Sequence, residues 1–358
     1  MRTLNVHPEV TKTIEEFSLP QSDEGLTFGQ VLAPIMIECD YRDGAWAKPV
    51  LKPYSPLTLD PTSKIFHYGQ CVYEGMKAYR VDGAGPYLFR PLDNLKRINQ
   101  SAKRMAMPQI DEQLWMDSII GLVRHCHDFI PQGSGESLYI RPFVVATEEH
   151  LGIKPSTQFK FVIVASPSGA YFTGGSISVL VEREYVRACP GGTGSAKTGG
   201  NYSGALASSV KAQQHGLNQT LWLDAIHRRY VEELSGMNFF SVIDGSLVTP
   251  ETSDTILPGI TRESLLKLAK DDGINIEERP IDIDELKAAI KDGRCTETFA
   301  CGTAVILTPI SEVAEEDGEK LTLKESYGPV AKSLRQKMLD LQEGRSHDPY
   351  GWRFEVPM

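Results

Sequence analysis

The stretch Pro190 to Gly204 reads PGGTGSAKTGGNYSG and carries the densest chemical signal in the chain. One lysine, Lys197, stands among small residues, with glycines on both sides of it. Because glycine has no Cβ atom, the backbone of such a stretch can approach a bound ligand closely. The sequence therefore predicts a small-molecule site centred on the Lys197 amine.

A phosphate-binding loop is one alternative, since Gly191 to Thr198 nearly matches the pattern G-x-x-x-x-G-K-T. Ala196 replaces the second glycine of that pattern, and Gly199-Gly200 should break the helix that has to open there. A nucleotide-binding module of this kind would bind ATP with magnesium and would be colourless. A flexible surface loop with a solvated lysine is the other alternative for a glycine-rich stretch taken alone.

Length and composition indicate a globular enzyme. The chain has 358 residues, 41% hydrophobic and 23% charged, a length that favours two domains. Its net charge of −10 argues against nucleic acid or an anionic membrane as a partner. Met1 to Phe17 lack the apolar core of a secretory signal, and no stretch approaches the roughly 18 apolar residues of a membrane span, so we expect a cytoplasmic protein. The cysteines are irregularly spaced, unlike a disulfide framework or a zinc site, and we expect no metal.

The first half of the chain mixes strand and helix patterns, which predicts a smaller α+β domain over residues 1–171. Strand-like runs occupy Val31–Cys39, Ser137–Val145 and Phe161–Ala165. One helix should follow Asp93 and stop at Pro108. A second should begin after Asp111 as N-cap and stop at Pro131.

The second half should form a larger domain over residues 185–358, with residues 172–184 as the interdomain connection, because YFTGG at 171–175 combines aromatic and turn residues. Strand patterns at 219–224, 230–233 and 238–243 precede the hairpin signal Asp244-Gly245. Helices should open after Gly259 and after Asp282, where Glu285 would complete a capping box.

Several ordered motifs carry a resemblance to a known family. They are FHYGQCVYEGMKAYR (Phe66–Arg80), LFRPLDNLKR (Leu88–Arg97), YIRP (Tyr139–Pro142), KTGGNY (Lys197–Tyr202), ELSGMN (Glu233–Asn238), LPGITR (Leu257–Arg262) and CGTA (Cys301–Ala304). Residues 28 to 310 closely resemble branched-chain amino-acid aminotransferases, which belong to the fold-type IV pyridoxal-phosphate enzymes. The resemblance implies a two-domain α/β fold with pyridoxal 5'-phosphate in the cleft between the domains.

The resemblance also implies the roles of the cofactor residues. Lys197 would form the Schiff base with the cofactor aldehyde and later move the substrate proton. Glu233 would pair with the pyridine nitrogen, with the adjacent Glu232 as a lower-ranked alternative, and Tyr202 would hydrogen-bond the ring oxygen. Arg97, the backbone amides and hydroxyl around Ile260-Thr261, and Thr303 would bind the phosphate, a role that suits a helix N-terminus.

By the same resemblance, the substrate pocket would be lined by Phe28, Tyr68, Tyr73, Tyr139, Tyr171 and the backbone at Ala304 and Val305. Aromatic walls favour leucine, isoleucine and valine side chains, while Arg141 would pair with the second carboxylate of L-glutamate, formed from 2-oxoglutarate. Gly236 stands where some relatives have threonine, and Tyr73 where some have phenylalanine. The family implies a homodimer whose first domains lie near the partner's site. Another fold-type IV activity, a D-amino-acid aminotransferase or an aminodeoxychorismate lyase, would keep Lys197, Tyr202 and Glu233.

Overall fold

The computed structural model describes residues 4–19, 26–169, 175–325 and 327–358. They form two compact units, which together make a two-domain α/β fold. Unit 1 comprises Met1–Tyr171, Ala196–Gly199 and Leu339–Met358, and unit 2 comprises Phe172–Ser195 and Gly200–Met338. Among the described residues, no helix is long and apolar enough to cross a bilayer.

Unit 1 is built on a mainly antiparallel sheet with the strand order β1-β4-β2-β9-β8-β6-β7-β19, while β3 pairs with β2 and β5 with β8. Its long central strands β8 and β9 are mostly buried, and only the second half of β8 alternates buried and less buried residues. The strands are β1 (Asn5–Val6), β2 (Ile35–Arg42), β3 (Ala45–Trp46), β4 (Val50–Pro53), β5 (Cys71–Tyr73), β6 (Met76–Val81), β7 (Ala84–Phe89), β8 (Ser137–Ala146), β9 (Phe159–Ser168) and β19 (Arg353–Glu355). The three strand-like runs expected in this half are confirmed as β2, β8 and β9.

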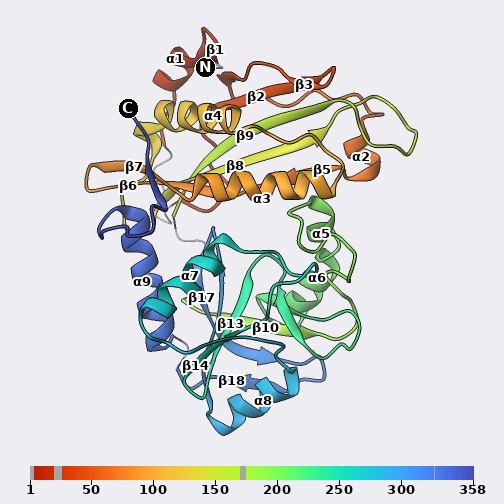
Figure 1. Cartoon of the computed structure of the whole chain (residues 1–358), viewed down its shortest axis with the longest axis vertical. Helices are drawn as coiled ribbons and strands as arrows, with labels where there is room; N and C mark the ends of the chain where they lie inside the picture. The colour runs from red at the N-terminus through yellow and green to blue at the C-terminus, as the bar shows by residue number, and fades with distance from the viewer. Residues whose placement is uncertain (1–3, 20–25, 170–174, 326) are drawn as a thin grey trace. The chain divides into compact units, whose positions relative to one another are not determined.

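Two long helices, α3 (Pro91–Arg104) and α4 (Glu112–His125), pack on this sheet (Figure 1). Both predicted helices are confirmed, although α3 begins at Pro91, where the proline ring suits the first helical position. Asp111 caps α4 as expected, because its side chain accepts a hydrogen bond from the Leu114 amide at 2.8 Å. Shorter helices complete the unit: α1 (Val10–Glu15), α2 (Lys64–Tyr68) and the 3₁₀ turn η1 (His127–Phe129).

Unit 2 contains a mixed sheet with the order β12-β11-β10-β17-β16-β13-β14-β15, and β18 pairs with β17. The strands are β10 (Ile177–Glu182), β11 (Gln219–Leu223), β12 (Val231–Leu234), β13 (Asn238–Ile243), β14 (Ser246–Thr249), β15 (Ile276–Glu278), β16 (Cys295–Gly302), β17 (Ile306–Ala314) and β18 (Lys320–Thr322). The β13–β14 hairpin is confirmed, with positive φ at both Asp244 and Gly245.

The interdomain connection expected over residues 172–184 is wrong for its second half. Residues Ile177–Glu182 form β10, which pairs in parallel with β11 and β17 in the interior of the unit 2 sheet. The turn signal at 171–175 predicted a connection, but the buried apolar run ISVLV that follows it forms a strand. A buried parallel strand shows such a run instead of alternation.

The helices between residues 199 and 343 are α5 (Gly199–Ser203), α6 (Leu206–Gln214), α7 (Ile260–Asp271), α8 (Ile283–Asp292) and α9 (Pro329–Glu343). The expectation that Gly199-Gly200 would prevent a helix is wrong, because α5 opens at Gly199. Glycine is costly in a helix interior but is tolerated in a first turn. Ala196 remains the argument against a phosphate-binding loop.

The helix starts predicted at Gly259 and Asp282 are confirmed, but the capping box at α8 is not. Asp282 accepts the Asp284 amide at 2.9 Å, whereas the Glu285 carboxylate binds the Arg279 guanidinium at 2.8 and 3.1 Å. Arginine offers two parallel donors to a carboxylate, which a backbone amide cannot match.

The C-terminal segment also departs from the expected domain limits. Residues Leu339–Met358 belong to unit 1 because β19 pairs antiparallel with β7, and Val356 is buried in the unit 1 core. The turn signal near residue 171 predicted instead that residues 185–358 all belong to the second domain. The three-residue strand β19 is too short to give a clear alternation in the sequence.

Candidate active site

Lys197 lies in a short segment of unit 1 that is bound along β5 and α3. The Lys197 carbonyl accepts the Tyr73 amide at 3.1 Å, and the Lys197 amide donates to the Ser101 hydroxyl at 2.9 Å. The Thr198 hydroxyl donates to the Cys71 carbonyl at 2.7 Å. The Lys197 Nζ lies 4.8 Å from the centre of the Tyr73 ring. The backbone on both sides of the amine is therefore fixed, and the amine itself lies over an aromatic ring.

Arg97, on α3, forms a buried ion pair with Glu74. The guanidinium Nε and Nη2 atoms lie 2.7 and 2.8 Å from the two Glu74 carboxylate oxygens. Glu74 is fully buried, and its carboxylate also accepts the Gly75 amide. A two-point contact of this kind fixes the plane of a guanidinium. Ser101 lies one turn further along α3 and connects the two functional segments, because its hydroxyl donates to the Arg97 carbonyl.

A cluster of aromatic and cationic side chains stands on β5 and β8. Arg141 donates to the Tyr139 hydroxyl at 2.8 Å, and its guanidinium lies 4.7 Å from the Tyr73 ring centre. The Phe28 and Tyr139 rings meet edge to face with their centres 4.7 Å apart. A Cβ atom at Gly75 would lie 2.1 Å from the Tyr139 hydroxyl, so this position needs glycine. Phe28, Tyr73, Tyr139 and Arg141 are thus brought together with Lys197 in unit 1.

Tyr68 is an expected substrate residue whose printed contacts lie outside this cluster. Tyr68 lies at the end of α2 and donates its hydroxyl to the Leu151 carbonyl. Its recorded contacts in the described part of the chain are with Leu151 and His67. Tyr171 lies outside the described residues.

Glu233, on β12 of unit 2, is a buried carboxylate that is 3% exposed. Its Oε1 atom accepts the Leu257 amide at 3.0 Å and lies 2.8 Å from the Arg187 guanidinium. Its Oε2 atom accepts the Asn238 side-chain amide at 3.0 Å. The neighbouring Glu232 is buried as well, but it binds the Thr255 hydroxyl. The two glutamates are adjacent on a strand, where successive side chains point to opposite faces.

The N-terminus of α7 provides free backbone donors. The first amide to bond within this helix is that of Glu263, which donates to the Gly259 carbonyl, so the amides of Ile260, Thr261 and Arg262 precede it. The N-cap is Gly259, which has no side chain to satisfy them. A Cβ atom at Gly259 would lie 1.9 Å from the Asn238 Oδ1 atom. This start of α7 therefore fits an anion, and a side chain at residue 259 would collide with a Glu233 partner.

The remaining expected residues lie around the β16–β17 turn of unit 2. Thr303, Ala304 and Val305 form this turn, and Gly302 at its start packs against the Gly236 carbonyl. A Cβ atom at Gly236 would make an ordinary 3.7 Å contact with the Tyr202 ring. Tyr202, Gly236 and the 302–305 turn are therefore neighbours within unit 2.

Four residues that were not predicted from the sequence bind the site residues: Glu74, Ser101, Arg187 and Asn238. Glu74 and Asn238 stand inside the quoted motifs YEGMKA and ELSGMN, where a charged or amide residue among apolar neighbours was the available signal. Ser101 and Arg187 carry no such signal in the sequence, because their partners, Lys197 and Glu233, are distant along the chain.

No group of three or more histidine, cysteine, aspartate or glutamate side chains that could hold a metal occurs among the described residues. Cys295 and Cys301 are buried thiols. Burial raises the pKa of Cys295 to about 12 and raises that of Cys301 as well, so neither thiol is suited to react as a thiolate.

The chain belongs to the amino-transferase class IV family, because the model of that family matches residues 71–313, more than half of its length. This match includes the Lys197 segment, Arg97, the Glu233 strand and the start of α7.

Similar proteins agree with this assignment. The chain is 45% identical over 333 residues to the branched-chain-amino-acid aminotransferase of Mycolicibacterium smegmatis, covering 91% of this chain and 90% of the relative. It is also 45% identical to branched-chain-amino-acid transaminase 1 of Bacillus subtilis, covering 92% and 94% of the two chains. The crystal structure of the T.th. branched-chain amino acid aminotransferase complexed with N-(5'-phosphopyridoxyl)-L-glutamate superposes with a TM-score of 0.74 at 28% identity, covering 92% of this chain and all of that one.

Proposed function

We propose that this protein is a pyridoxal-phosphate-dependent branched-chain amino-acid aminotransferase. It transfers the amino group between L-leucine, L-isoleucine or L-valine and 2-oxoglutarate in a ping-pong cycle, which yields branched-chain 2-oxo acids and L-glutamate. The observation that carries this proposal is the 45% identity to two enzymes of that name over more than nine tenths of the chain. The match is too extensive to reflect a shared glycine-rich loop alone.

The residues present fit the cofactor. Pyridoxal 5'-phosphate supplies a carbonyl group that takes up the substrate nitrogen and a ring that accepts the electron pair left when the Cα proton departs. Its phosphate suits the Arg97 guanidinium, Thr303 and the free amides at Ile260 and Thr261, while the buried Glu233 carboxylate suits a protonated ring nitrogen. Tyr202 suits the ring oxygen. Each unit therefore offers groups that the cofactor needs.

Lys197 would hold the cofactor and would move the substrate proton, so that one side chain would serve as nucleophile and base. The bonds of the Lys197 backbone to Tyr73 and Ser101 fix the segment that carries this amine. A base that is already positioned avoids much of the entropic cost of a proton transfer.

Substrate choice rests on the cluster in unit 1. The rings of Phe28, Tyr73 and Tyr139 present apolar surface to an aliphatic side chain, whose burial is worth about 0.8 kcal/mol per methylene. Arg141, held by Tyr139 and Tyr73, offers a cation to the second carboxylate of glutamate. Tyr68, Tyr171, Gly236, Ala304 and Val305 complete the proposed pocket.

We also propose that the enzyme is a homodimer. The support is an exposed apolar surface on unit 1, the α2 patch, formed by Phe66, Leu151 and Ile153, which are 60%, 61% and 90% exposed. The loop that carries Leu151 and Ile153 is bound to α2, because the Lys64 amine donates to the Gly152 carbonyl at 3.0 Å. An apolar patch held rigidly at the surface is typical of a subunit interface. The cytoplasmic location and the lack of nucleic-acid or membrane partners stay predictions from the sequence.

A Lys197→Ala variant tests the function directly. The purified wild-type protein should be yellow with pyridoxal 5'-phosphate and should transfer amino groups from a panel of L-amino acids to 2-oxoglutarate, with the branched-chain donors fastest. The variant should lose the visible absorption of the bound cofactor and essentially all transamination. A colourless wild type that binds ATP with magnesium, or a variant that retains turnover, would refute the proposal.

A further inference from the structure

The glycine-rich stretch before Lys197 has a second structural task within unit 2. Residues 187–195, which include the first part of this stretch, are bound to the loop at Asp254-Thr255. The Ser195 amide donates to the Asp254 carbonyl at 2.9 Å, and the Gly191 amide donates to the Asp254 carboxylate at 2.6 Å. A Cβ atom at Gly194 would lie 2.5 Å from the Thr255 Cα atom, so only glycine allows this contact. The stretch therefore fixes the backbone of Arg187 against that loop.

Arg187 extends from this backbone to Glu233. Its side chain is 3% exposed, and its Nη2 atom lies 2.8 Å from Glu233 Oε1. The other recorded bonds of the guanidinium go to neutral carbonyl groups, those of Thr255 at 3.1 Å and Gly194 at 3.3 Å. The two carbonyl groups orient the guanidinium, and the Glu233 carboxylate neutralises its positive charge.

The other partners of the Glu233 carboxylate named above are neutral amides, those of Leu257 and Asn238. A buried carboxylate without a cation tends to take up a proton, because burial disfavours the charged form. Arg187 is the cation that the ion pairs of the described residues place on Glu233. The Arg187 guanidinium therefore favours the ionised state of Glu233.

The adjacent Glu232 does not compete for this charge. Burial raises the pKa of Glu232, and this effect outweighs the Thr255 hydrogen bond and the attraction of Arg187, while Asp224 and Asp254 raise the pKa further. Its Oε2 atom has no hydrogen-bond partner among the described residues. Burial also raises the pKa of the Cys301 thiol, which Glu233 raises further and Arg262 lowers. The two neighbouring glutamates are thus held in different environments, because Arg187 pairs with Glu233 whereas burial raises the pKa of Glu232.

We propose that Arg187 is a positioning residue for transamination, which holds the Glu233 carboxylate in place and ionised so that it can bind the ring nitrogen of the cofactor. The inference rests on the proposed function. Arg187 acts through Glu233 and does not itself contact the cofactor. Replacing it by a neutral residue removes the cation that lies 2.8 Å from this buried carboxylate, and Glu233 then binds a protonated ring nitrogen more weakly.

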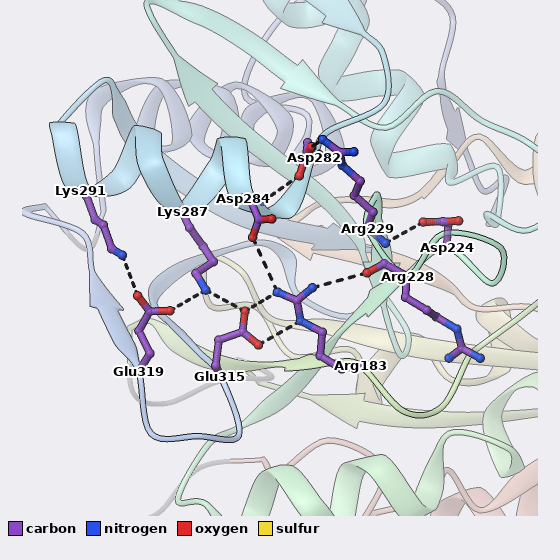
Figure 2. Close-up of polar contacts among 10 residues, drawn as sticks. All are labelled: Arg183, Asp224, Arg228, Arg229, Asp282, Asp284, Lys287, Lys291, Glu315 and Glu319. Carbon is purple, nitrogen blue, oxygen red and sulfur yellow. Dashed lines mark hydrogen bonds and ion pairs between the residues drawn. The ribbon is translucent and has the colours of Figure 1, made fainter.

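The test compares three single variants with the wild type. Arg187→Gln removes the charge, Arg187→Lys keeps it, and Arg183→Gln is the matched control. Arg183 also follows β10 and also binds a glutamate, Glu315, at 2.7 Å, but it lies in an exposed network (Figure 2). The Arg187→Gln change is also made together with Glu233→Gln. Thermal unfolding of each protein without cofactor measures any general loss of stability.

The main measurement is the dissociation constant of pyridoxal 5'-phosphate from the cofactor-free protein, by titration. Arg187→Gln should raise this constant by about tenfold or more, because about 1.4 kcal/mol of lost interaction corresponds to a factor of ten. Arg187→Lys should recover part of the affinity, and Arg183→Gln should match the wild type. In the Glu233→Gln background, Arg187→Gln should cause little further loss, since residues that act as a unit are not additive.

A purely structural role for Arg187 would give a different pattern. Arg187→Gln would then weaken cofactor binding by the same factor whether residue 233 is glutamate or glutamine, and that result would overturn the proposal. An Arg187→Gln protein with wild-type affinity would overturn it too, while leaving the proposed function intact. A wild type that binds no pyridoxal 5'-phosphate would overturn the proposed function and this inference together.

Discussion

At the scale of single residues, the site is held by buried charges that each need a partner. Arg97 has Glu74, Glu233 has Arg187, and none of these four side chains is exposed enough to be stabilised by water instead. Removing one member of a buried pair is costly because the other charge remains in place. The partners should therefore matter nearly as much as the residues that contact the cofactor.

A Glu74→Gln substitution tests this for the phosphate side of the site. Loss of the carboxylate leaves the buried Arg97 without its anion, and we expect a stability loss of about 3–5 kcal/mol. Arg97 also loses its fixed orientation, so the dissociation constant of pyridoxal 5'-phosphate should rise by about tenfold or more. Urea unfolding and cofactor titration measure the two effects.

Glu38→Gln is the control, because Glu38 also pairs with cations in unit 1, Lys52 and Lys160, but on β2. It should lower stability to a smaller extent and leave cofactor affinity unchanged. Equal cofactor affinities in the Glu74→Gln protein and the wild type would contradict the role assigned to Glu74.

The site could be predicted from the sequence only as far as its motifs extend. Lys197, Tyr202 and Glu233 stand in stretches whose residue types suggest their chemistry. Arg187 reaches Glu233 across 46 positions of the chain, and neither spacing nor composition indicates that contact. A motif also marks Tyr68, whose hydroxyl donates to the Leu151 carbonyl, and its place in the substrate pocket stays a prediction.

At the scale of elements, predictions succeeded where a local signal dominates. Asp111, Gly259 and Asp282 mark helix starts, and Asp244-Gly245 marks a hairpin, because caps and turns depend on nearby backbone atoms. β10 was missed although its apolar run ISVLV is typical of a buried parallel strand. β19 was missed because three residues are too few to show an alternation.

The start of α7 can be tested with Gly259→Ala. The new methyl group would overlap Asn238, which must shift and release Glu233 or the Leu257 carbonyl. Such overpacking typically costs about 1–3 kcal/mol, and the affinity for pyridoxal 5'-phosphate should fall with it. Lys270→Ala, on the exposed last turn of the same helix, is the control and should leave the affinity for pyridoxal 5'-phosphate unchanged. A Gly259→Ala protein with wild-type affinity and stability would show that the start of α7 tolerates a side chain.

The charged network on α8 and the β17–β18 hairpin gives a pH-dependent prediction (Figure 2). Hydrogen bonds from Lys287 and Lys291 lower the pKa of Glu319 to about 2. The depressed pKa means that this network stabilises the folded state above the ordinary glutamate pKa of about 4.3 and that the stabilisation is lost as the pH falls toward 2. The wild type should therefore exceed Glu319→Gln in unfolding free energy at pH 6, and the difference should shrink between pH 4 and pH 2.

Urea unfolding at several pH values measures this difference, with Glu325→Gln as an exposed control in the same unit. A difference between the wild type and Glu319→Gln that stays constant down to pH 2 would show that Glu319 does not titrate as the network requires.

At the scale of the whole molecule, the assembly can be tested on the α2 patch. Ile153→Glu places a charge on the most exposed apolar side chain of the patch, and a buried interface does not tolerate an unpaired charge. Light scattering after gel filtration should show a dimer for the wild type and a shift toward monomer for the variant. Ile226→Glu is the matched control, because Ile226 is 68% exposed in unit 2 and lies outside the patch. A dimer that survives Ile153→Glu would place the interface elsewhere.

The return of the chain to unit 1 in β19 has a consequence for protein synthesis. The edge of β7 receives its partner only when residues 353–355 have left the ribosome, after all of unit 2 has been translated. Until then the nascent first unit lacks Phe354 and Val356 from its apolar cluster. An open strand edge beside an incomplete core is a target for aggregation and for chaperones, so residues translated after unit 2 complete the core of unit 1, most of which was translated before it.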